Sequence, residues 1–258
     1  MKKLLSGNQA IVEGAKKAGG SYFAGYPITP ASEIMHDWAA WADSQHKSKD
    51  PRDIKFLQTE DEIAAVHSII GAALAGRKAF TATSGPGFSL MQEGIGWAYA
   101  IQAPIVIINS QRQGPSTGMP TMPAQGDILQ TQFGSHSDYQ TIVFYPNSVQ
   151  ECYEYTIRAF NAAQEAQSPV VLLTDAFLSH LIEAVELDFN EKIIDIKSSP
   201  LTKLDKTRYF TGLTSVNNIP KTKDPEAFIK WENERSEKIQ QAASKYPFHE
   251  LYGRQDAK

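Results

Sequence analysis

Two hydrophobic periods alternate along the first 180 residues, and this alternation constrains the fold more than any other feature. Short runs rich in β-branched and aromatic residues, which favour strands, lie at 21–26, 54–59, 78–83, 104–110, 141–145 and 169–174. Most segments between them carry apolar residues three and four apart, as amphipathic helices do. Apolar strands that alternate with helices indicate a parallel sheet covered on both faces. We therefore predict one doubly wound α/β domain over residues 1–185, with a mostly parallel six-stranded sheet.

Local signals place three helices. One apolar stripe runs from Ile34 to Trp41, and a second runs from Ile63 to Ala73 and ends before Gly76, a suitable C-cap residue. Ser148 and Glu151 have the spacing of a capping box and predict the start of a third helix.

The pattern weakens after Phe189, where lysine-rich and proline-spaced polar stretches begin. One helix is predicted from Asp224, with Pro225 at its first position and a sparse apolar stripe through Phe228, Trp231 and Ile239. Such a thin stripe is typical of a helix that lies on another surface. We predict that residues 186–258 are an irregular, partly helical extension packed on the domain or on a partner.

Composition and charge exclude several classes. With 41% hydrophobic residues, 21% charged residues and a net charge of −4, the chain has an ordinary globular composition and no signal for nucleic acid or an anionic membrane. The first residues hold too short an apolar run for a signal peptide, and no stretch approaches a membrane span of about 20 apolar residues. The single cysteine, Cys152, excludes an internal disulfide and an iron–sulfur cluster held by this chain alone. A cytoplasmic protein is predicted.

Ligands of open α/β sheets bind beyond the carboxyl ends of the strands. In this sequence, that rule selects four loops, which carry YPITP (26–30), TEDE (59–62), TSGPG (83–87) and SQRQGPSTGMPT (110–121). Nearly every unusual residue of the chain lies in one of them, and this coincidence is the first indication of a site.

The YPITP loop has two interpretations. Thr29 suits an N-cap and Pro30 a first helical residue, so the segment could simply start a helix. A helix start does not require Pro27. This proline stiffens the chain where it leaves the strand and would hold Thr29 in place. The Thr29 hydroxyl could then hydrogen-bond a bound carboxylate or carbonyl.

Three acids, Glu60, Asp61 and Glu62, follow the second strand. An acidic first turn complements the dipole of a helix, and this is the simpler interpretation. One of the three could still face the cleft, where desolvation would raise its pKa and allow proton exchange with a ligand nitrogen.

The two remaining loops carry glycines and an arginine. TSGPG allows close backbone approach, but it is neither GxGxxG nor a P-loop, and a tight turn is at least as good an interpretation. Arg112 follows the most hydrophobic strand and opens a proline-fixed loop; its guanidinium suits bidentate capture of a carboxylate or phosphate. His67, His136 and His180 lack metal-ligand spacing, so no metal site is predicted.

Taken together, the four loops resemble the alpha subunit of 2-oxoacid:ferredoxin oxidoreductases, above all the 2-oxoglutarate and branched-chain types. The resemblance rests on the order and spacing of YPITP, QTEDEIAAV, TATSGPGFSLMQE and QRQGPSTGMPT, the last followed by QGD. The resemblance covers residues 5–183, and RYFTGLT at 208–214 resembles the segment that follows. It implies a fold that binds the pyrimidine end of thiamine diphosphate.

The resemblance also implies roles for single residues. By motif, Glu60 is the carboxylate that hydrogen-bonds the pyrimidine N1′ and favours the imino tautomer, which removes the C2 proton. Thr29 and Arg112 match the substrate-contacting residues, with the hydroxyl near the carbonyl and the guanidinium on the carboxylate of a 2-oxo acid. Further residues expected beside the cofactor are Tyr26, Pro27, Ser84 and Gly85.

The implied reaction is oxidative decarboxylation of a 2-oxo acid, with coenzyme A taking the acyl group and ferredoxin the electrons through iron–sulfur clusters. The GPSTGMPT stretch favours 2-oxoglutarate, and branched-chain acids stay open.

The sequence predicts that a partner completes the site. Enzymes of this kind hold the cofactor diphosphate through Mg²⁺ with a Gly-Asp-Gly motif and a following Asn-Asn pair. Here Gly126-Asp127 is followed by Ile128, and the only Asn-Asn is the distant Asn217-Asn218. We therefore expect a beta subunit to supply the metal half and the clusters, in a hetero-oligomer.

The family's alpha subunit usually continues into a second α/β domain, whereas this sequence ends at Lys258. We expect that the sequence is truncated or that the domain resides on another chain. An alternative is a non-catalytic assembly or binding subunit that retains the fold.

Overall fold

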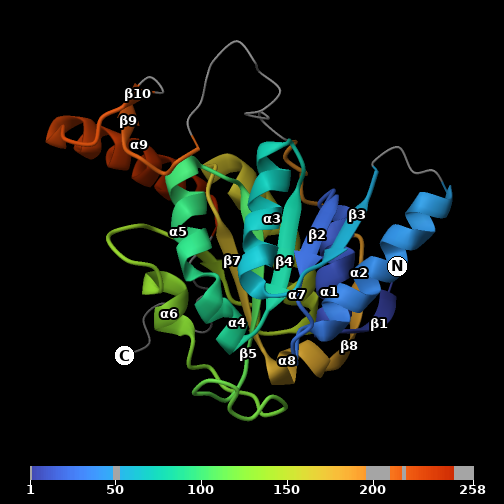
Figure 1. Ribbon diagram of the computed structural model, residues 1–258. Coiled ribbons are helices and arrows are strands. Elements are labelled where there is room, and N and C mark those ends of the chain that lie inside the picture. Colours follow the sequence, from blue (N-terminus) through green and yellow to red (C-terminus); the bar gives the residue numbers. More distant parts are fainter. Residues whose placement is uncertain (1, 49–52, 196–209, 217–218, 247–258) are drawn as a thin grey trace, which may run out of the picture.

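Six parallel strands form the central sheet, in the order β3-β2-β4-β5-β7-β6 (Figure 1). The computed structural model describes residues 2–48, 53–195, 210–216 and 219–246. The strands are β2 (Tyr22–Gly25), β3 (Lys55–Gln58), β4 (Ala79–Thr83), β5 (Ile105–Gln111), β6 (Ile142–Phe144) and β7 (Val170–Asp175). Each lies inside its predicted run or extends one residue beyond it, so the predicted doubly wound sheet is confirmed.

Burial on both faces explains the near-continuous apolar runs of the central strands. Every residue of β4, β5 and β7 is buried, whereas the edge strand β3 is largely exposed. Successive side chains along a strand point to opposite faces, so β4 and β5 each feed two separate apolar clusters. Val106 and Ile108 join one cluster, and Ile105 and Ile107 join the other.

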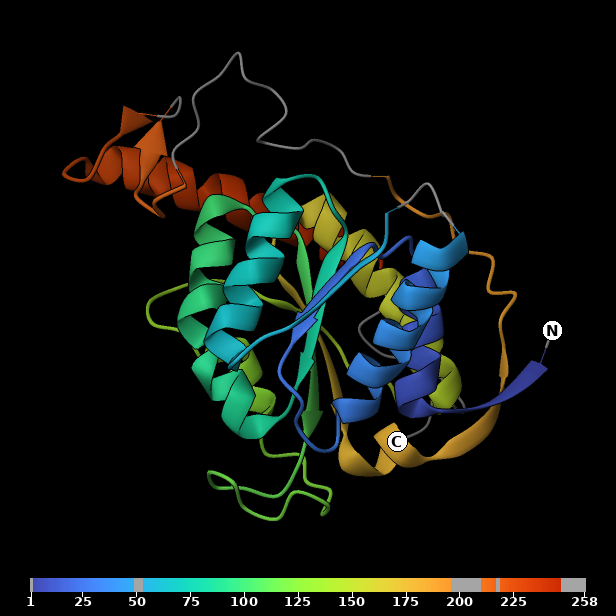
Figure 2. The same cartoon turned by 45° about the vertical axis from the view of Figure 1, so that its right-hand side comes forward.

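Helices cover both faces of the sheet (Figure 2). Helices α1 (Gly7–Lys17), α2 (Ser32–Ser48) and α7 (Val149–Ala166) pack into the first cluster, and α3 (Glu62–Leu74) and α5 (Gln92–Ile101) into the second. The short helices α4 (Gly85–Leu90), α6 (Ile128–Phe133) and α8 (Ala176–His180) lie near the carboxyl ends of strands. No helix of the described residues is both long and apolar enough to span a membrane.

The chain changes direction across the sheet between β2 and β4. From β2 it passes to the edge strand β3 and then crosses back to β4 on the other side of β2. The carboxyl ends of neighbouring strands diverge at such a switch point, and ligands of open α/β sheets bind there. The four predicted loops follow β2, β3, β4 and β5, so all of them lie at this edge.

The local helix signals were mostly right. Helix α3 ends at Leu74, and Gly76 behind its C-cap has a φ of +87°, as a helix-ending glycine requires. The Ser148 hydroxyl accepts from the Glu151 N–H and caps α7, but the reciprocal half of the capping box is different. The Glu151 carboxylate accepts from the N–H of Asn147, one residue further back.

One interpretation of the YPITP loop was wrong, and one pair of strands was not predicted. Helix α2 begins at Ser32, so Thr29 is not its N-cap and Pro30 not its first residue; both lie in a turn that precedes the helix. The unpredicted strands, β1 (Lys2–Ser6) and β8 (Ile182–Glu186), form an antiparallel pair. Both strands lie outside the main sheet and expose much of their length, so they lack the continuous apolar signal of the central strands.

The predicted helix of the C-terminal extension is confirmed as α9 (Pro225–Ala243), with Asp224 as its N-cap. It lies across the ends of α5 and α7 in Figure 2. The Tyr99 hydroxyl donates to Glu232 at 2.5 Å, and the Arg235 guanidinium donates to the Ala100 carbonyl at 2.8 Å. Ile239 is buried in the first cluster, but Phe228, which the predicted stripe included, is about half exposed.

A short antiparallel pair, β9 (Ser215–Val216) and β10 (Ile219–Pro220), precedes α9. The Asn217-Asn218 pair, Lys258 and the first residues of RYFTGLT lie outside the described residues.

Candidate active site

The loops after β2 and β5 meet through a hydrogen bond between Arg112 and Thr29. The Arg112 Nη1 donates to the Thr29 carbonyl oxygen at 2.7 Å, across 83 residues of sequence. Thr29 and Tyr26 are exposed residues, and Pro27 is half-buried. The structure thus brings together the two residues that were predicted to contact substrate.

Arg112 is 7% exposed, which is unusual for a cation. Besides Thr29, it donates from Nη2 to the Thr117 carbonyl at 3.0 Å. Its Nε is buried without a partner among the described residues. Burial lowers the pKa of the guanidinium, and the charge of Glu62 opposes this shift. Because its hydrogen bonds go to neutral carbonyls, its positive charge can serve an anionic ligand.

The three consecutive acids have different surroundings. Glu60 and Asp61 are exposed, and the Asp61 carboxylate accepts from the Ala64 N–H at 2.7 Å as the N-cap of α3. Glu62 is only 5% exposed. Burial raises the pKa of Glu62, Asp61 raises it further, and its own backbone N–H and the Arg112 charge act in the opposite direction. The enclosed acid of this loop is therefore Glu62.

Glu62 lies directly against the loop after β4. A Cβ added at Gly87 would come within 2.4 Å of the Glu62 Oε1 and 2.2 Å of the Thr83 hydroxyl. No side chain fits there, so the glycine allows the carboxylate to approach the backbone of α4. This contact joins the loops after β3 and β4, as the hydrogen bond to Thr29 joins those after β2 and β5.

Ser84 and Gly85 begin the loop after β4. Ser84 is fully buried, and its hydroxyl has no partner among the described residues. A Cβ at Gly85 would have as its near neighbour only the Asp127 Oδ2, at 3.9 Å, so the backbone here is open to close approach. The TSGPG loop therefore combines an unsatisfied buried hydroxyl with accessible backbone.

A polar support behind this loop was not predicted from the sequence. Asn109 donates from Nδ2 to the Asp127 Oδ2 at 3.0 Å, and Gln111 accepts from the Asp127 N–H at 3.0 Å. Both side chains are buried in β5, and the Asn109 Oδ1 has no described partner. These bonds fix the far end of the irregular loop that begins at Arg112. Polar residues inside an otherwise apolar strand were the available signal.

That irregular loop also closes on itself. The Met119 N–H donates to the Gln113 carbonyl and the Gln113 N–H donates to the Met122 carbonyl, each at 2.9 Å. Gly118 has a φ of +55°, and a Cβ there would lie 1.9 Å from the Gln113 carbonyl oxygen. The loop is thus a folded unit that presents the Thr117 carbonyl to Arg112.

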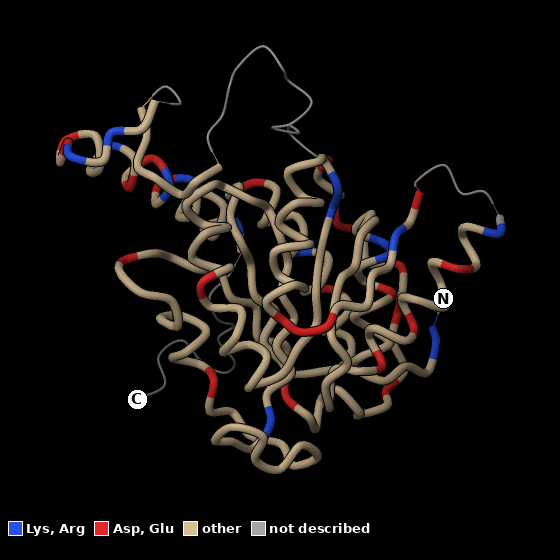
Figure 3. The backbone as a smooth tube through the Cα atoms, in the orientation of Figure 1, with Lys and Arg blue, Asp and Glu red and all other residues tan. Residues whose placement is uncertain are grey.

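Two segments of these loops carry almost no charged residues, in contrast to the acidic loop after β3 (Figure 3). Residues 83–92 contain no charged side chain, and residues 113–134 contain only Asp127. Large apolar side chains in these segments are exposed by 47% to 70%; they are Leu90, Met119, Met122, Ile128, Leu129 and Phe133. A patch of this kind is typical of a surface that binds another molecule.

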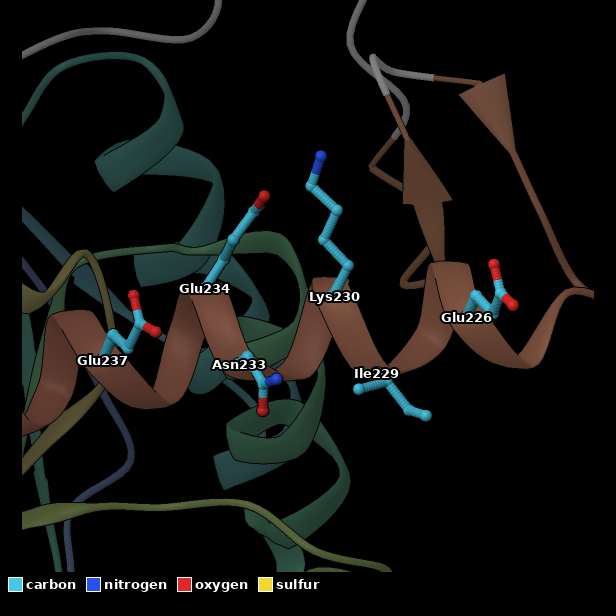
Figure 4. Close-up of a pocket in the computed structure, with 6 residues that line it drawn as sticks. All are labelled: Glu226, Ile229, Lys230, Asn233, Glu234 and Glu237. Carbon is cyan, nitrogen blue, oxygen red and sulfur yellow. The ribbon is translucent and has the colours of Figure 1, made fainter.

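Two hollows lie away from these loops. One is formed along α9 by residues such as Lys230, Asn233 and Glu237, which Figure 4 draws. Another lies near Arg158 and Tyr246, where Arg158 pairs with Glu191. Neither includes a residue of the four loops.

The family profile described as pyruvate flavodoxin/ferredoxin oxidoreductase, thiamine diphosphate-binding, matches residues 13–252. The chain belongs to this family. The resemblance noted in the sequence is thereby confirmed, and with it the thiamine diphosphate-binding fold.

Relatives within this family have related names. The chain is 44% identical over 229 residues to the 2-oxoglutarate synthase subunit KorA of Archaeoglobus fulgidus, covering 88% of this chain and 64% of that protein. It is 48% identical over 195 residues to the same subunit of Methanocaldococcus jannaschii, covering 76% and 51%. Identity to the ketoisovalerate oxidoreductase subunit VorB of Methanothermobacter thermautotrophicus is 41%, covering 75% and 52%. The chain thus spans about half to two thirds of the length of these relatives.

A solved structure shares the fold. The 2-oxoglutarate:ferredoxin oxidoreductase from Magnetococcus marinus, with 2-oxoglutarate, coenzyme A and succinyl-CoA bound, superimposes with a TM-score of 0.86. It is 28% identical in sequence, and the match covers 98% of this chain and 47% of that chain. The parallel sheet and its flanking helices are therefore those of an enzyme of this family.

Proposed function

We propose that this chain is the alpha subunit of a 2-oxoacid:ferredoxin oxidoreductase, in which it binds the aminopyrimidine end of thiamine diphosphate. The observation that carries the proposal is the buried Glu62 carboxylate at the strand switch point, which lies against Gly87 of α4 and interacts with the charge of Arg112. When bound, thiamine diphosphate supplies a nucleophilic carbon and an electron sink for the loss of CO2.

The residues present fit such a cofactor. An aminopyrimidine offers ring nitrogens and an exocyclic amine, which need both donors and acceptors from the protein. The Ser84 hydroxyl, the Asn109 Oδ1 and the Glu62 carboxylate are buried polar groups near the same edge, and the first two have no described partner. Buried polar groups usually have a hydrogen-bonding partner, and a ligand would supply one here.

Glu62, rather than the expected Glu60, is the acid we assign to the pyrimidine nitrogen. A carboxyl that shares a proton with a ring nitrogen must be enclosed, because desolvation brings the two pKa values closer together. Glu62 meets this requirement, since it is buried and its pKa is raised. Glu60 is exposed to solvent. The position of Glu60 in the motif made it the candidate from the sequence. The exposure of Glu60 and the burial of Glu62 favour Glu62 for this role.

Arg112 and Thr29 are the proposed substrate residues. The guanidinium would hold the carboxylate of the 2-oxo acid through a charge-assisted hydrogen bond, for which its Nε is free among the described residues. The Thr29 hydroxyl would lie near the oxo group, since Arg112 holds the Thr29 backbone at 2.7 Å. Tyr26, Pro27, Ser84 and Gly85 would line the cofactor.

2-Oxoglutarate is the proposed substrate. The relatives named 2-oxoglutarate synthase subunit are 44% to 48% identical to this chain, and the two ketoisovalerate subunits are 40% to 41% identical. Coenzyme A and ferredoxin are the proposed acyl and electron acceptors, and the cytoplasm is the proposed location.

A beta subunit is proposed to cover the uncharged apolar surface around the loops. It would hold the cofactor diphosphate with Mg²⁺ and carry the iron–sulfur clusters. The six exposed apolar side chains of residues 83–92 and 113–134 support an interface at the rim of the site, because their burial would be favourable. The second candidate function, a non-catalytic assembly subunit, rests on the same surface, which needs no chemistry to bind a partner.

Reconstitution with the beta subunit tests both functions. Under anaerobic conditions, with thiamine diphosphate, Mg²⁺ and coenzyme A, reduction of a viologen dye is followed for a panel of 2-oxo acids. We expect turnover, fastest with 2-oxoglutarate. An intact complex that reduces no dye with any acid would favour the assembly subunit.

The neighbouring acids provide a matched pair for the same assay. Glu62→Gln keeps the size of the buried side chain and is expected to lower turnover by at least about 100-fold, the usual size of a general acid–base contribution. Glu60→Gln makes the same chemical change on an exposed side chain and should keep most of the activity. The opposite order of effects would return the role to Glu60.

A further inference from the structure

Asn8 on α1 is a fully buried amide that reaches the loop after β2. Its Nδ2 donates to the Pro30 carbonyl at 2.8 Å, across 22 residues of sequence, and to the Glu33 Oε2 at 3.0 Å. Both partners are acceptors only, so the orientation of the amide is fixed by its contacts. The Asn8 Oδ1 is buried without a partner among the described residues.

The start of α1 is itself held firmly. The Ser6 hydroxyl accepts from the Gln9 N–H, and the Gln9 Oε1 accepts from the Ser6 N–H, which completes a capping box around Asn8. A Cβ added at Gly7 would lie 2.1 Å from the Leu178 carbonyl oxygen, so the chain here presses directly on α8. Asn8 therefore donates from a rigid base.

Two donors from different elements hold successive carbonyls of the loop. Arg112, at the end of β5, donates to the Thr29 carbonyl, and Asn8, on α1, donates to the Pro30 carbonyl. We propose that Asn8 is a positioning residue, which fixes the backbone around Thr29 with respect to Arg112. Its relevance to substrate binding rests on the proposed function of Thr29 and Arg112.

The cost of burying this amide supports the inference. A buried side-chain oxygen without a hydrogen bond is unfavourable, and an apolar residue at the same place would avoid that cost. The bond to Pro30 holds a turn that has no helix or strand of its own, and the bond to Glu33 ties Asn8 to the first turn of α2.

Asn161 on α7 provides a matched control. It is 1% exposed, and its Nδ2 also donates to a backbone carbonyl, that of Lys192, at 2.9 Å. A glutamate carboxylate, that of Glu191, lies 3.4 Å from the same nitrogen. Asn161 therefore donates the same kinds of bond as Asn8, and its Oδ1 also accepts from the Ile194 N–H at 2.9 Å, but it holds a segment remote from the four loops.

The experiment compares Asn8→Ala with Asn161→Ala in the reconstituted complex. Hydrogen exchange is measured for the peptide that spans residues 26–31, where the Ala31 N–H donates to the Ile28 carbonyl at 2.8 Å. KM for 2-oxoglutarate and kcat are measured on the same samples. If Asn8→Ala fails to fold, Asn8→Ser replaces it, since it removes the amide but keeps a buried polar group.

We expect both alanine variants to lose stability, but only Asn8→Ala to speed exchange in residues 26–31 and to raise KM. An increase of about tenfold corresponds to the loss of a buried hydrogen bond. Equal exchange of residues 26–31 in the two variants would overturn the inference. If the wild-type complex shows no turnover, the proposed function fails, and the exchange comparison still decides whether Asn8 holds the loop.

Discussion

Replacing Gly87 by alanine tests the contact between the loops after β3 and β4. The added methyl carbon would lie 2.2 Å from the Thr83 hydroxyl and 2.4 Å from the Glu62 Oε1, whereas real Cβ contacts essentially never fall below 3.0 Å. The side chains or the helix must therefore move by at least 0.8 Å (3.0 − 2.2) and 0.6 Å (3.0 − 2.4). Thr83 and Glu62 are both buried, so neither can turn into solvent.

Overpacking of this kind costs about 1–3 kcal/mol. Gly71→Ala is the matched control, because Gly71 lies in helix α3 and a Cβ there would meet nothing within 4 Å. It is expected to gain roughly 0.5–1 kcal/mol, since alanine restricts the unfolded chain more than glycine does. The two changes should therefore shift the free energy of unfolding in opposite directions from wild type, and the two variants should differ by about 1.5–4 kcal/mol.

The free energy of unfolding is measured by urea denaturation, and thiamine diphosphate affinity is measured in the complex. Gly87→Ala should lower both, because it displaces the Glu62 carboxylate that we propose to contact the cofactor. Gly71→Ala should leave the affinity unchanged. A Gly87→Ala protein as stable as Gly71→Ala, with wild-type affinity, would refute the placement of Glu62 against α4.

Three further changes test other contacts. Burial raises the pKa of Glu62 above its ordinary value of 4.5, so the folded protein binds more protons than the unfolded chain in this range. The wild-type protein should therefore lose stability as the pH rises from 4.5 through the raised pKa, and Glu62→Gln should reduce this loss. Identical urea midpoints from pH 4 to 8 in the two proteins would argue against this. Arg112→Lys removes the guanidinium group that donates to the Thr29 and Thr117 carbonyls, and it should raise KM for the 2-oxo acid by at least about tenfold in the dye assay. An unchanged KM would show that the guanidinium does not bind the substrate carboxylate. Tyr99→Phe breaks the 2.5 Å bond to Glu232 and should speed hydrogen exchange in α9 without changing KM; unaltered exchange would show that α9 is docked by other contacts.

The sheet could be predicted from the sequence because burial on both faces leaves a strong signal. A strand such as β5 is apolar on both sides, and its run ends where buried polar residues begin. The pair β1 and β8 could not be found in this way, since within the described residues these strands pair only with each other, and they expose Leu4 and Ile182. Their apolar residues are too few to distinguish a strand from a loop.

The loops of the site were predicted, but the enclosed acid was not. Three adjacent acids after a strand are equivalent until the first residue of the helix is known. In the structure, Asp61 is the N-cap of α3. Glu62 is therefore the first residue of the helix, and its carboxylate lies against α4. Aspartate is a preferred N-cap residue, so its position could have indicated where α3 begins. The proximity of Gly87 depends on the packing of α4, which no local pattern records.

The buried Asn109 and Asn8 illustrate a similar limit. Asn109 begins a polar run at the end of an apolar strand, and Asn8 lies among polar residues at the start of a helix, so neither position indicates its hydrogen-bonding partner. The partners, Asp127 and Pro30, lie 18 and 22 residues away and follow from the tertiary fold. Sequence patterns therefore locate the edge of the sheet where we propose that the ligand binds, and the tertiary fold decides which side chains face that edge.

The most direct test of this account is an experimental structure of the complex with thiamine diphosphate. The account predicts that the Glu62 carboxylate lies within hydrogen-bonding distance, about 2.6–3.2 Å, of a pyrimidine ring nitrogen. Arg112 should then lie on the substrate side of the cofactor. A structure in which Glu60, or a residue of the partner, contacts that nitrogen while Glu62 faces only protein would contradict it.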